Sequence, residues 1–196
     1  MDTLIQKFKD HVIEKSQNPN FVHHKWFTKY HLEIVEKIAM ELCDKHNDAD
    51  RDLVLTLVWL HDYGKILDCD NQYEVTLMKG KEILEELGFQ KHFVEKAISY
   101  VEIMDKKMQI DLNLTPIEIK IISSADGASH FVGPFLNFWR QDHPNKEPEE
   151  LMEDNLEKIM KDWNKKIVLP EVKKAFENRF NLFLERCGQF PSKFVY

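Results

Sequence analysis

Apolar residues recur at intervals of three and four along most of this 196-residue chain, which is the spacing of helices that bury one face. The first stripe covers residues 4–13, and a second runs from about 22 to 43. Asn47 and Asp48 offer caps for a third helix, whose apolar run continues up to His61. The same spacing predicts further helices over about 73–87, 90–106, 148–164 and 170–186.

Residues 117–121 alternate apolar and charged side chains, which is the period of a strand. Thr115 and Glu118 nevertheless form the pattern of a capping box, with Pro116 at the first helical position, where its missing N–H costs nothing. No second segment has a convincing strand pattern that could pair with this one. We therefore predict a helix that leads to Asp126, and an all-α fold.

The chain shows no internal repeat, low-complexity tract or shift of composition that would mark a domain boundary. We predict a single domain over residues 1–196. It is expected to be an all-α helical bundle with its core at about 20–140 and additional C-terminal helices at about 147–190 that form a cap. A chain of this length removes roughly 70% of its unfolded surface from water on folding, so the core needs no disulfide or metal.

The charge and the cysteines limit the class of partner and the compartment. A formal net charge of -7 argues against a nucleic-acid polymer or an anionic membrane as partner, because both favour a basic face, although a basic pocket for a small anion stays compatible. The three cysteines form no Cys-x-x-Cys pair, which predicts free thiols in a reducing compartment. With no secretion signal and no run of roughly 18 apolar residues, we expect a cytoplasmic protein that does not enter membranes. Nothing in the sequence indicates an oligomeric state.

Four residues on three segments place an imidazole or a carboxylate on an otherwise apolar face. His31 lies one turn before Val35 on the inward face of its predicted helix, a position that is also typical of a hydrogen-bonded core histidine. His61 and Asp62 end the apolar run of the third helix. Asp126 ends another apolar stretch, where a carboxylate must be paired or bind a cation. Two imidazoles and two carboxylates suit a divalent first-row ion with positions left open for water and a substrate oxygen.

These residues stand in a characteristic order. His31 is followed by His61-Asp62 within His-Asp-Tyr-Gly-Lys-Ile, and Asp126 stands within Ala-Asp-Gly-Ala-Ser-His-Phe. Over about residues 20–140, this resembles the HD-domain superfamily of metal-dependent phosphohydrolases, which are all-α. The resemblance implies that His31, His61, Asp62 and Asp126 bind one divalent ion, and that a water on this ion attacks phosphorus. The identity of the ion stays open among Mn, Fe, Co, Ni, Mg and Zn.

The sequence departs from part of this family. Members with two metals carry extra histidines roughly where this chain has Tyr73, Glu74, Met104 and Asp105. We therefore expect a single ion, and neither oxygenase-type chemistry nor cyclic-dinucleotide hydrolysis. Nucleotidase relatives carry a glutamate where Lys65 stands, so that catalytic assignment does not carry over.

Further candidate residues lie close to these ligands along the chain. Lys65 follows Asp62 by about one turn, and we predict that Lys65 grips a substrate phosphate, with both residues in catalytic roles. The alternative for Lys65 is an ion pair with a nearby aspartate and no further role. His130 is four residues past Asp126 and is either a substrate contact, as phosphate ligand or proton donor, or a surface histidine. Asp105 is a further candidate for binding substrate.

Two classes of function follow from this set of residues. The first is a metal-dependent phosphohydrolase acting on a small phosphate ester, with a nucleotide as one candidate substrate. The second is a binding or regulatory module in which the same ion holds a nucleotide or another anion without turnover. A third interpretation, in which the ion only links helices, is disfavoured because a chain of this length does not need such a link. The aromatic series over residues 131–139 is typical of core packing, and would favour a nucleoside if it faced the pocket.

Overall fold

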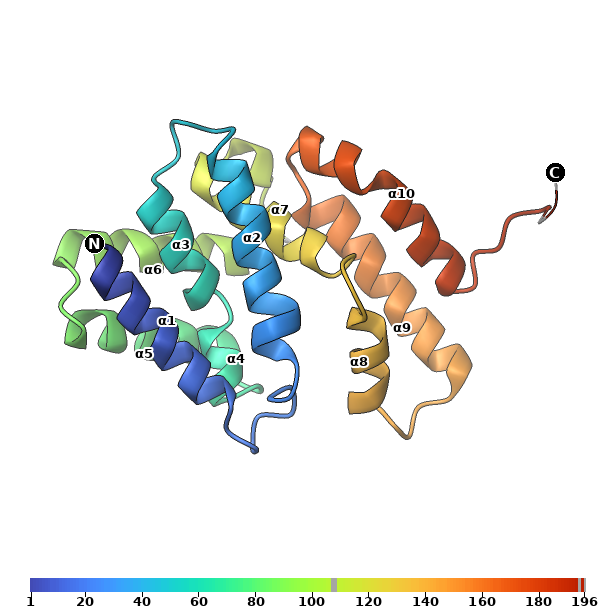
Figure 1. The fold of residues 1–196 in the computed structure, drawn as a ribbon, viewed down its shortest axis with the longest axis horizontal. Helices are drawn as coiled ribbons and strands as arrows, with labels where there is room; N and C mark the ends of the chain where they lie inside the picture. The colour runs from blue at the N-terminus through green and yellow to red at the C-terminus, as the bar shows by residue number, and fades with distance from the viewer. Residues whose placement is uncertain (107–108, 194, 196) are drawn as a thin grey trace.

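A computed structural model describes residues 1–106, 109–193 and 195, and the described residues form helices and no strand (Figure 1). The predicted all-α fold is therefore confirmed. In chain order the elements are α1 (Asp2–Ser16), the π-helical turn η1 (Thr28–Leu32), α2 (Glu33–Cys43), α3 (Arg51–Leu60), α4 (Tyr63–Leu67), α5 (Gln72–Glu86), α6 (Lys91–Asp105), the 3-10 turn η2 (Leu112–Leu114), α7 (Ile117–Ser129), α8 (Phe135–Asp142), α9 (Pro148–Lys161), the π-helical turn η3 (Asp162–Lys166) and α10 (Pro170–Arg186).

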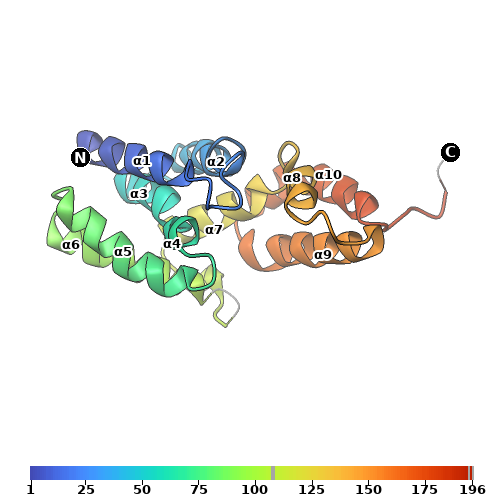
Figure 2. The ribbon, with the colours of Figure 1, turned by 90° about the horizontal axis from the view of Figure 1, so that it is seen from below.

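Helix α7 is the central element of the fold. It packs against α2, α3 and α6 on one side and against η3 and α10 on the other. Figures 1 and 2 show it between the group formed by α1 to α6 and the group formed by α8, α9 and α10. Every residue from 121 to 129 is buried, including polar ones. A polar side chain on α7 is therefore held in the interior, where it needs a partner.

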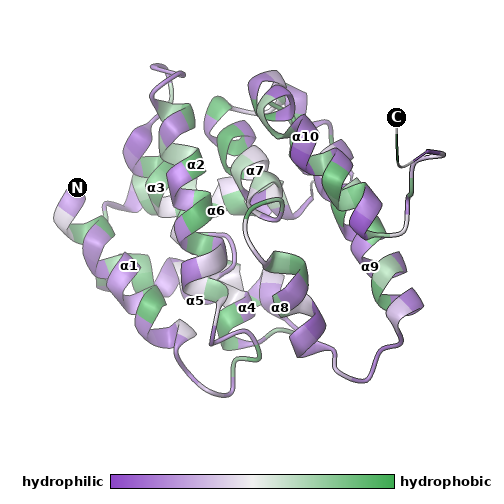
Figure 3. Cartoon of the chain, turned by 45° about the vertical axis from the view of Figure 1, so that its right-hand side comes forward, coloured by the Kyte–Doolittle hydropathy of each residue, from purple (hydrophilic) through white to green (hydrophobic). Residues whose placement is uncertain are grey.

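Helix α3 supplies much of the core in the N-terminal group. Seven of its ten residues are buried, because it lies among α1, α2, α6 and α7. Trp59 is fully buried, and its indole N–H donates to Glu36 at 2.6 Å, so its one polar atom is satisfied. By contrast, α1, α2 and α10 each carry a hydrophobic and a hydrophilic side in Figure 3, as expected for helices that border solvent.

The predicted continuous helix over 22–43 is wrong in its first part. Residues 22–26 form turns, the π-helical turn η1 follows, and regular α-helix begins only at Glu33. The reason is visible in the buried residues of this stretch, Phe21, His23, Trp26 and Phe27. Their irregular spacing cannot place all four on one face of a regular helix.

Two helices begin within three residues of the predicted positions, but the hydrogen bonds at their starts differ from those predicted. Asp50 caps α3 by accepting the Leu53 N–H at 3.1 Å, in place of Asn47 or Asp48. At α7 the capping box is not formed. The Thr115 hydroxyl donates to the Leu112 carbonyl, and the Glu118 carboxylate accepts the N–H of Asp50 at 3.3 Å.

Glu118 therefore connects two helix starts across the fold instead of closing its own. The helix predicted up to Asp126 is present all the same, and it continues to Ser129. Pro116 stands at the N-cap position, one residue before the place that the pattern gave it.

The C-terminal part begins with α8, which no apolar period predicted. The helix predicted at 148–164 is α9, which ends at Lys161 and continues as the π-helical turn η3. The helix predicted at 170–186 is α10, with the bounds unchanged. We refer to α9, η3 and α10 as the C-terminal cap. Among the described residues, no helix combines the length and the apolar character needed to cross a membrane.

Candidate metal centre

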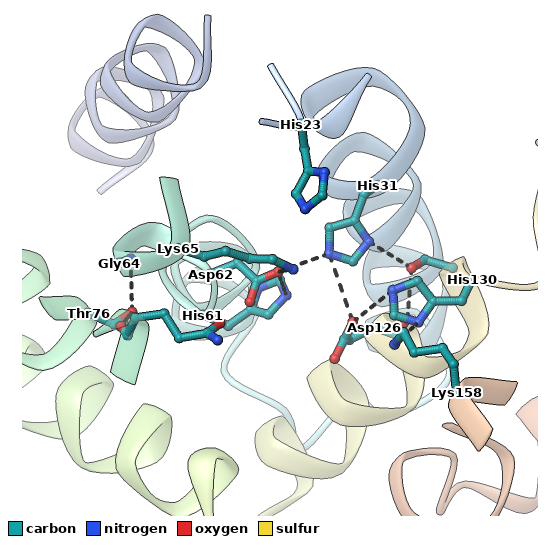
Figure 4. A network of polar contacts seen from close by, with 12 residues as sticks. His23, His31, His61, Asp62, Gly64, Lys65, Thr76, Asp126, His130 and Lys158 are labelled. Carbon is teal, nitrogen blue, oxygen red and sulfur yellow. Dashed lines mark hydrogen bonds and ion pairs between the residues drawn. The ribbon is translucent and has the colours of Figure 1, made fainter. Parts of the chain in front are cut away.

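The four predicted ligands come from separate elements and meet at one place. His31 lies on η1, His61 is the C-cap of α3, Asp62 lies in the turn before α4, and Asp126 lies on α7. His31 Nε2 is 3.3 Å from Asp62 Oδ2 and 3.9 Å from Asp126 Oδ1. His61 Nε2 is 3.8 Å from Asp62 Oδ2. Figure 4 shows His31 between the side chains from the α3–α4 turn and those from α7.

A close contact between α4 and α5 sets the position of the His61-Asp62 pair. The Gly64 N–H donates to Thr76 Oγ1 at 2.9 Å. A Cβ atom on Gly64 would lie 2.0 Å from the Gln72 carbonyl oxygen, so only glycine allows this approach. The glycine within the motif therefore serves the packing of the short helix that carries Lys65, and fixes the turn that precedes it.

Hydrogen bonds at the outer nitrogens orient the two imidazoles. His61 Nδ1 donates to the Val58 carbonyl at 2.8 Å. His31 Nδ1 lies 3.0 Å from Ser129 Oγ, whose own proton goes to the Asp126 carbonyl at 2.7 Å, so Nδ1 is the donor. In both rings Nε2 is left without its proton and faces the carboxylates, which is the orientation of a metal-binding histidine.

The residues present fit a divalent ion. His61 Nε2 is buried and has no hydrogen-bond partner among the described residues, an arrangement that would cost about 1 to 3 kcal/mol if nothing else satisfied the atom. Ligand atoms held about 2.1 Å from one ion lie roughly 3 to 4.2 Å apart. Three of the separations, His31–Asp62, His31–Asp126 and His61–Asp62, fall in that range at 3.3 to 3.9 Å. The ligand atoms of His31, His61 and Asp62 all lie within 4.8 Å of one another.

The protonation states also suit metal ligands. Burial acts to raise the pKa of Asp62, but the charge of Lys65 in particular opposes it, and the pKa lies well below the usual range. Burial acts in the same direction on Asp126, and Lys166 in particular brings its pKa well below the usual range. Burial lowers the pKa of His31. Ionised carboxylates and a neutral imidazole are the forms that bind a cation.

A cavity of about 320 Å³ opens beside this group and contains the predicted substrate contacts. Lys65, Asp105 and His130 line it together with the four predicted ligands. Lys65 also pairs with Asp62 at 3.6 Å, so the ion pair that we considered as its alternative role coexists with a place at the cavity. His130 is only 5% exposed, which excludes the alternative of a surface histidine.

The aromatic series divides between the core and the cavity. Phe135 and Trp139 line the cavity, and Trp26 and Phe27 from the N-terminal group do so as well. Phe131 is buried away from it, against Phe180, Phe183 and Trp163. The wall nearest α8 is therefore aromatic.

The contribution of the C-terminal cap to the site was not predicted from the sequence. Lys158, Lys161 and Lys166 line the cavity from α9 and η3. Lys166 Nζ lies 2.7 Å from Asp126 Oδ2 and 3.2 Å from Asp162 Oδ1, and Asp162 is fully buried. The signal was a Lys-x-x-x-Asp-x-x-x-Lys pattern over 158–166, next to the buried Ile159 and Ile167, which places three charges on an inward face.

The buried charges of the cap shift one another's pKa values. Burial acts to lower the pKa of Lys166, but Asp126 and Asp162 outweigh it and raise the pKa above its usual value. Burial, helped by the charge of Lys166, lowers the pKa of Lys158 to about 8. Burial also lowers the pKa of His130 to about 3, so this imidazole is neutral near pH 7. The cap thus brings two cations and one carboxylate to the ligand group.

The fold and the site together define a recognisable class of protein. It is an all-α bundle whose helices bring two histidines and two aspartates to a lysine-rich cavity. The family description for the HD domain matches residues 28–165, more than half of the chain, and the protein belongs to this family. Members of the family are mostly metal-dependent hydrolases, and they typically bind divalent metals. The comparisons with curated proteins and with solved structures gave no match.

Proposed function

We propose that the protein is a metal-dependent phosphohydrolase that acts on a small phosphate ester, with one divalent ion held by His31, His61, Asp62 and Asp126. The observation that carries this proposal is the buried Nε2 of His61, which has no hydrogen-bond partner among the described residues and lies 3.8 Å from the ionised Asp62, at the wall of a cavity lined by lysines. Membership of the HD-domain family supports it. When bound, the ion polarises a phosphoryl group and lowers the pKa of a water.

The chain's own residues bind and orient the phosphate. Lys65 binds a phosphoryl oxygen with its ammonium, a compact charge suited to that task. Asp62 has a catalytic role both as a ligand and, through its ion pair with Lys65, as the residue that positions this lysine, with Lys65 Nζ 3.6 Å from Asp62 Oδ2. Lys161 is exposed at the cavity and makes no ion pair within the described ranges, so it is free to meet the substrate on the cap side.

The cavity favours a small anionic substrate. Four of its lining residues are lysines, against three aspartates, although the chain as a whole has a net charge of -7. Its volume of about 320 Å³ lies at the lower end of the range for small-molecule sites. Trp26, Phe135 and Trp139 give it an aromatic side that suits a flat ring, which makes a nucleotide a candidate substrate. A nucleic-acid polymer or a membrane does not enter this proposal.

A second candidate function is a metal-containing module that binds a nucleotide or another anion without turnover. The observation that favours this second function is the lack of a second set of histidines at the cavity. At the positions where two-metal relatives carry histidines, the cavity of this chain is lined by Tyr73, Met104 and Asp105. Recovery of the ligand unchanged after binding would favour this function over hydrolysis.

Hydrolysis by reconstituted protein separates the two candidates. Metal-free protein would be loaded in turn with Mn, Fe, Co, Ni, Mg and Zn and offered an aryl phosphate, an aryl phosphodiester and a panel of nucleotides. We expect turnover with at least one pairing, and its loss in His61→Ala but not in His92→Ala, since His92 is exposed on α6. Hydrolysis of no substrate, or undiminished activity in His61→Ala, would refute the proposal.

A further inference from the structure

His130 approaches Asp126, one of the proposed metal ligands, as closely as His31 does. Its Nε2 atom lies 3.8 Å from Asp126 Oδ1, and His31 Nε2 lies 3.9 Å from the same oxygen. The two imidazole rings are stacked in parallel, with centroids 5.1 Å apart and planes 4° apart (Figure 4). The ligand atoms of His31, Asp126 and His130 lie within 4.8 Å of one another, as do those of the group that His31 forms with His61 and Asp62.

The outer nitrogen of His130 is held by a carboxylate from the C-terminal cap. Nδ1 lies 2.8 Å from Asp162 Oδ2. Asp162 is fully buried and ion-paired with Lys158 and Lys166, which keep it ionised. Because a carboxylate only accepts, a contact this short requires the proton to reside on Nδ1. Nε2 then carries a lone pair directed to the ligand group.

Lys158 could in principle impose the other tautomer. Its ammonium lies 3.2 Å from His130 Nδ1, and a proton donated there would leave Nε2 protonated and unable to bind a cation. The ammonium nevertheless reaches both oxygens of Asp162, at 3.0 and 3.2 Å. A charge-assisted bond to a carboxylate is stronger than one to an imidazole, so Lys158 serves Asp162 and leaves Nδ1 to donate.

A histidine that donates its outer N–H to a carboxylate or carbonyl while its inner nitrogen faces the ion is the usual arrangement in protein metal sites. His61 has this arrangement through the Val58 carbonyl, and in His31 the Ser129 hydroxyl takes the place of the carbonyl. We infer that His130 is a fifth protein ligand to the proposed ion, and that Asp162 of the C-terminal cap is the residue that positions it. The inference rests on the metal centre of the proposed function and adds to it both a ligand and a role for the cap.

A third imidazole changes which ions the site prefers. Imidazole suits iron, nickel, copper and zinc, whereas magnesium and manganese prefer oxygen ligands. Three histidines with two carboxylates therefore favour the later first-row ions over magnesium. With five protein ligands, an ion that takes six keeps one position open, which would serve the attacking water, while Lys65 rather than the ion would bind the phosphoryl oxygen.

Cobalt(II) gives a direct test, because the Nδ1 proton of a cobalt-bound imidazole yields an exchangeable NMR signal far outside the ordinary proton range. Metal-free protein with one equivalent of cobalt should show three such signals, from His31, His61 and His130. His130→Gln should show two. The matched control is His23→Gln, which should keep three. His23 lines the same cavity, is 6% exposed and has its Nδ1 2.6 Å from Asp142, but it belongs to neither ligand group.

Cobalt affinity, measured by competition with a chelator, is the second readout. Asp162→Asn should weaken binding about 10- to 100-fold, the usual cost of losing the partner of a ligand histidine. His130→Gln should weaken it by at least as much, and His23→Gln should leave it unchanged. Magnesium should bind to the unmodified protein more weakly than cobalt.

The outcomes separate this inference from the proposal on which it rests. Two shifted signals in the unmodified protein, or unchanged signals and affinity in His130→Gln, would overturn the fifth ligand and leave the four-ligand centre standing. Undiminished cobalt affinity in His61→Gln would instead contradict the centre itself. The signal count in the unmodified protein requires no substitution, so it decides the matter even if a variant folds poorly.

Discussion

Lys166 places its ammonium 2.7 Å from a carboxylate oxygen of Asp126, forty residues earlier in the chain. This contact ties the C-terminal cap to the helix at the centre of the fold, at the residue that we propose as the fourth metal ligand. Because both side chains are buried, neither charge can turn to water if the other is removed. The cap therefore contributes charges to the site as well as side chains that line the cavity.

The first prediction concerns this ion pair. Lys166→Met should destabilise the metal-free protein by about 3 to 5 kcal/mol, because Asp126 and Asp162 lose their shared buried cation. Urea unfolding followed by circular dichroism measures the effect. Lys165→Met is the control, since Lys165 is exposed on the same turn η3 and should cost little. Equal stability of the two variants would mean that the pair contributes nothing.

The second prediction concerns the glycine of the motif. Gly64→Ala should cost at least about 3 kcal/mol, because a Cβ atom would lie 2.0 Å from the Gln72 carbonyl, which is backbone and cannot turn away. Gly80→Ala on α5 is the matched comparison. Its Cβ atom would lie 2.5 Å from the end of the Leu60 side chain, which can turn, and 3.7 Å from Ile98, an ordinary contact. Because alanine also favours helix, the change should stay within about 1 kcal/mol. A Gly64→Ala protein as stable as Gly80→Ala would show that α4 and α5 can separate without cost.

The third prediction concerns acid stability. Burial lowers the pKa of His23 in the folded protein below 6.5, although the hydrogen bond with Asp142 opposes this. Between the folded pKa and 6.5 the unfolded chain binds the proton and the folded chain does not. The free energy of unfolding should therefore fall as the pH drops below about 6.5, with a slope from this group of no more than about 1.4 kcal/mol per pH unit.

Urea titrations at several pH values between 4 and 8 measure this slope in the parent protein and in His23→Gln. The variant should lose part of the pH dependence, whereas replacement of the exposed His92 should not change it. An unchanged slope in His23→Gln would remove His23 from the account of acid sensitivity.

The fourth prediction concerns Lys65. Lys65→Gln should lower kcat/KM for the best phosphate ester about 10²- to 10³-fold, the usual cost of removing one preorganised charge from a transition state. Metal content should stay the same, because Lys65 pairs with a ligand but does not bind the ion. Lys79→Gln provides the control, since Lys79 is exposed on α5 and pairs with Glu82. Unaltered kinetics in Lys65→Gln would restrict the lysine to its ion pair with Asp62.

Local signals in the sequence were sufficient for several elements. The apolar spacing over residues 170–186 predicted α10, which the structure shows with these bounds. The convergence of His31, His61, Asp62 and Asp126 was predicted from their inward positions and their order. Each of these depends on one helix face or on a motif read along the chain.

Features that depend on pairing across the fold were not predictable in this way. The Glu118 carboxylate accepts from Asp50 rather than closing a capping box, since a distant N–H competes with the local one. The spacing of Asp162 and Lys166 after Lys158 indicates an inward face, but it does not show which residues of other helices these two side chains meet. Their partners, His130 and Asp126, lie more than thirty residues away.

The central claim is that Asp126 meets the imidazoles of His31 and His61 around one divalent ion, and elemental analysis of the purified protein tests it most directly. We predict one transition-metal ion per chain in the unmodified protein and its loss in Asp126→Ala, with helical content retained in both. A protein that binds no divalent ion even after reconstitution, or an Asp126→Ala variant that keeps the ion with the same affinity, would contradict the account.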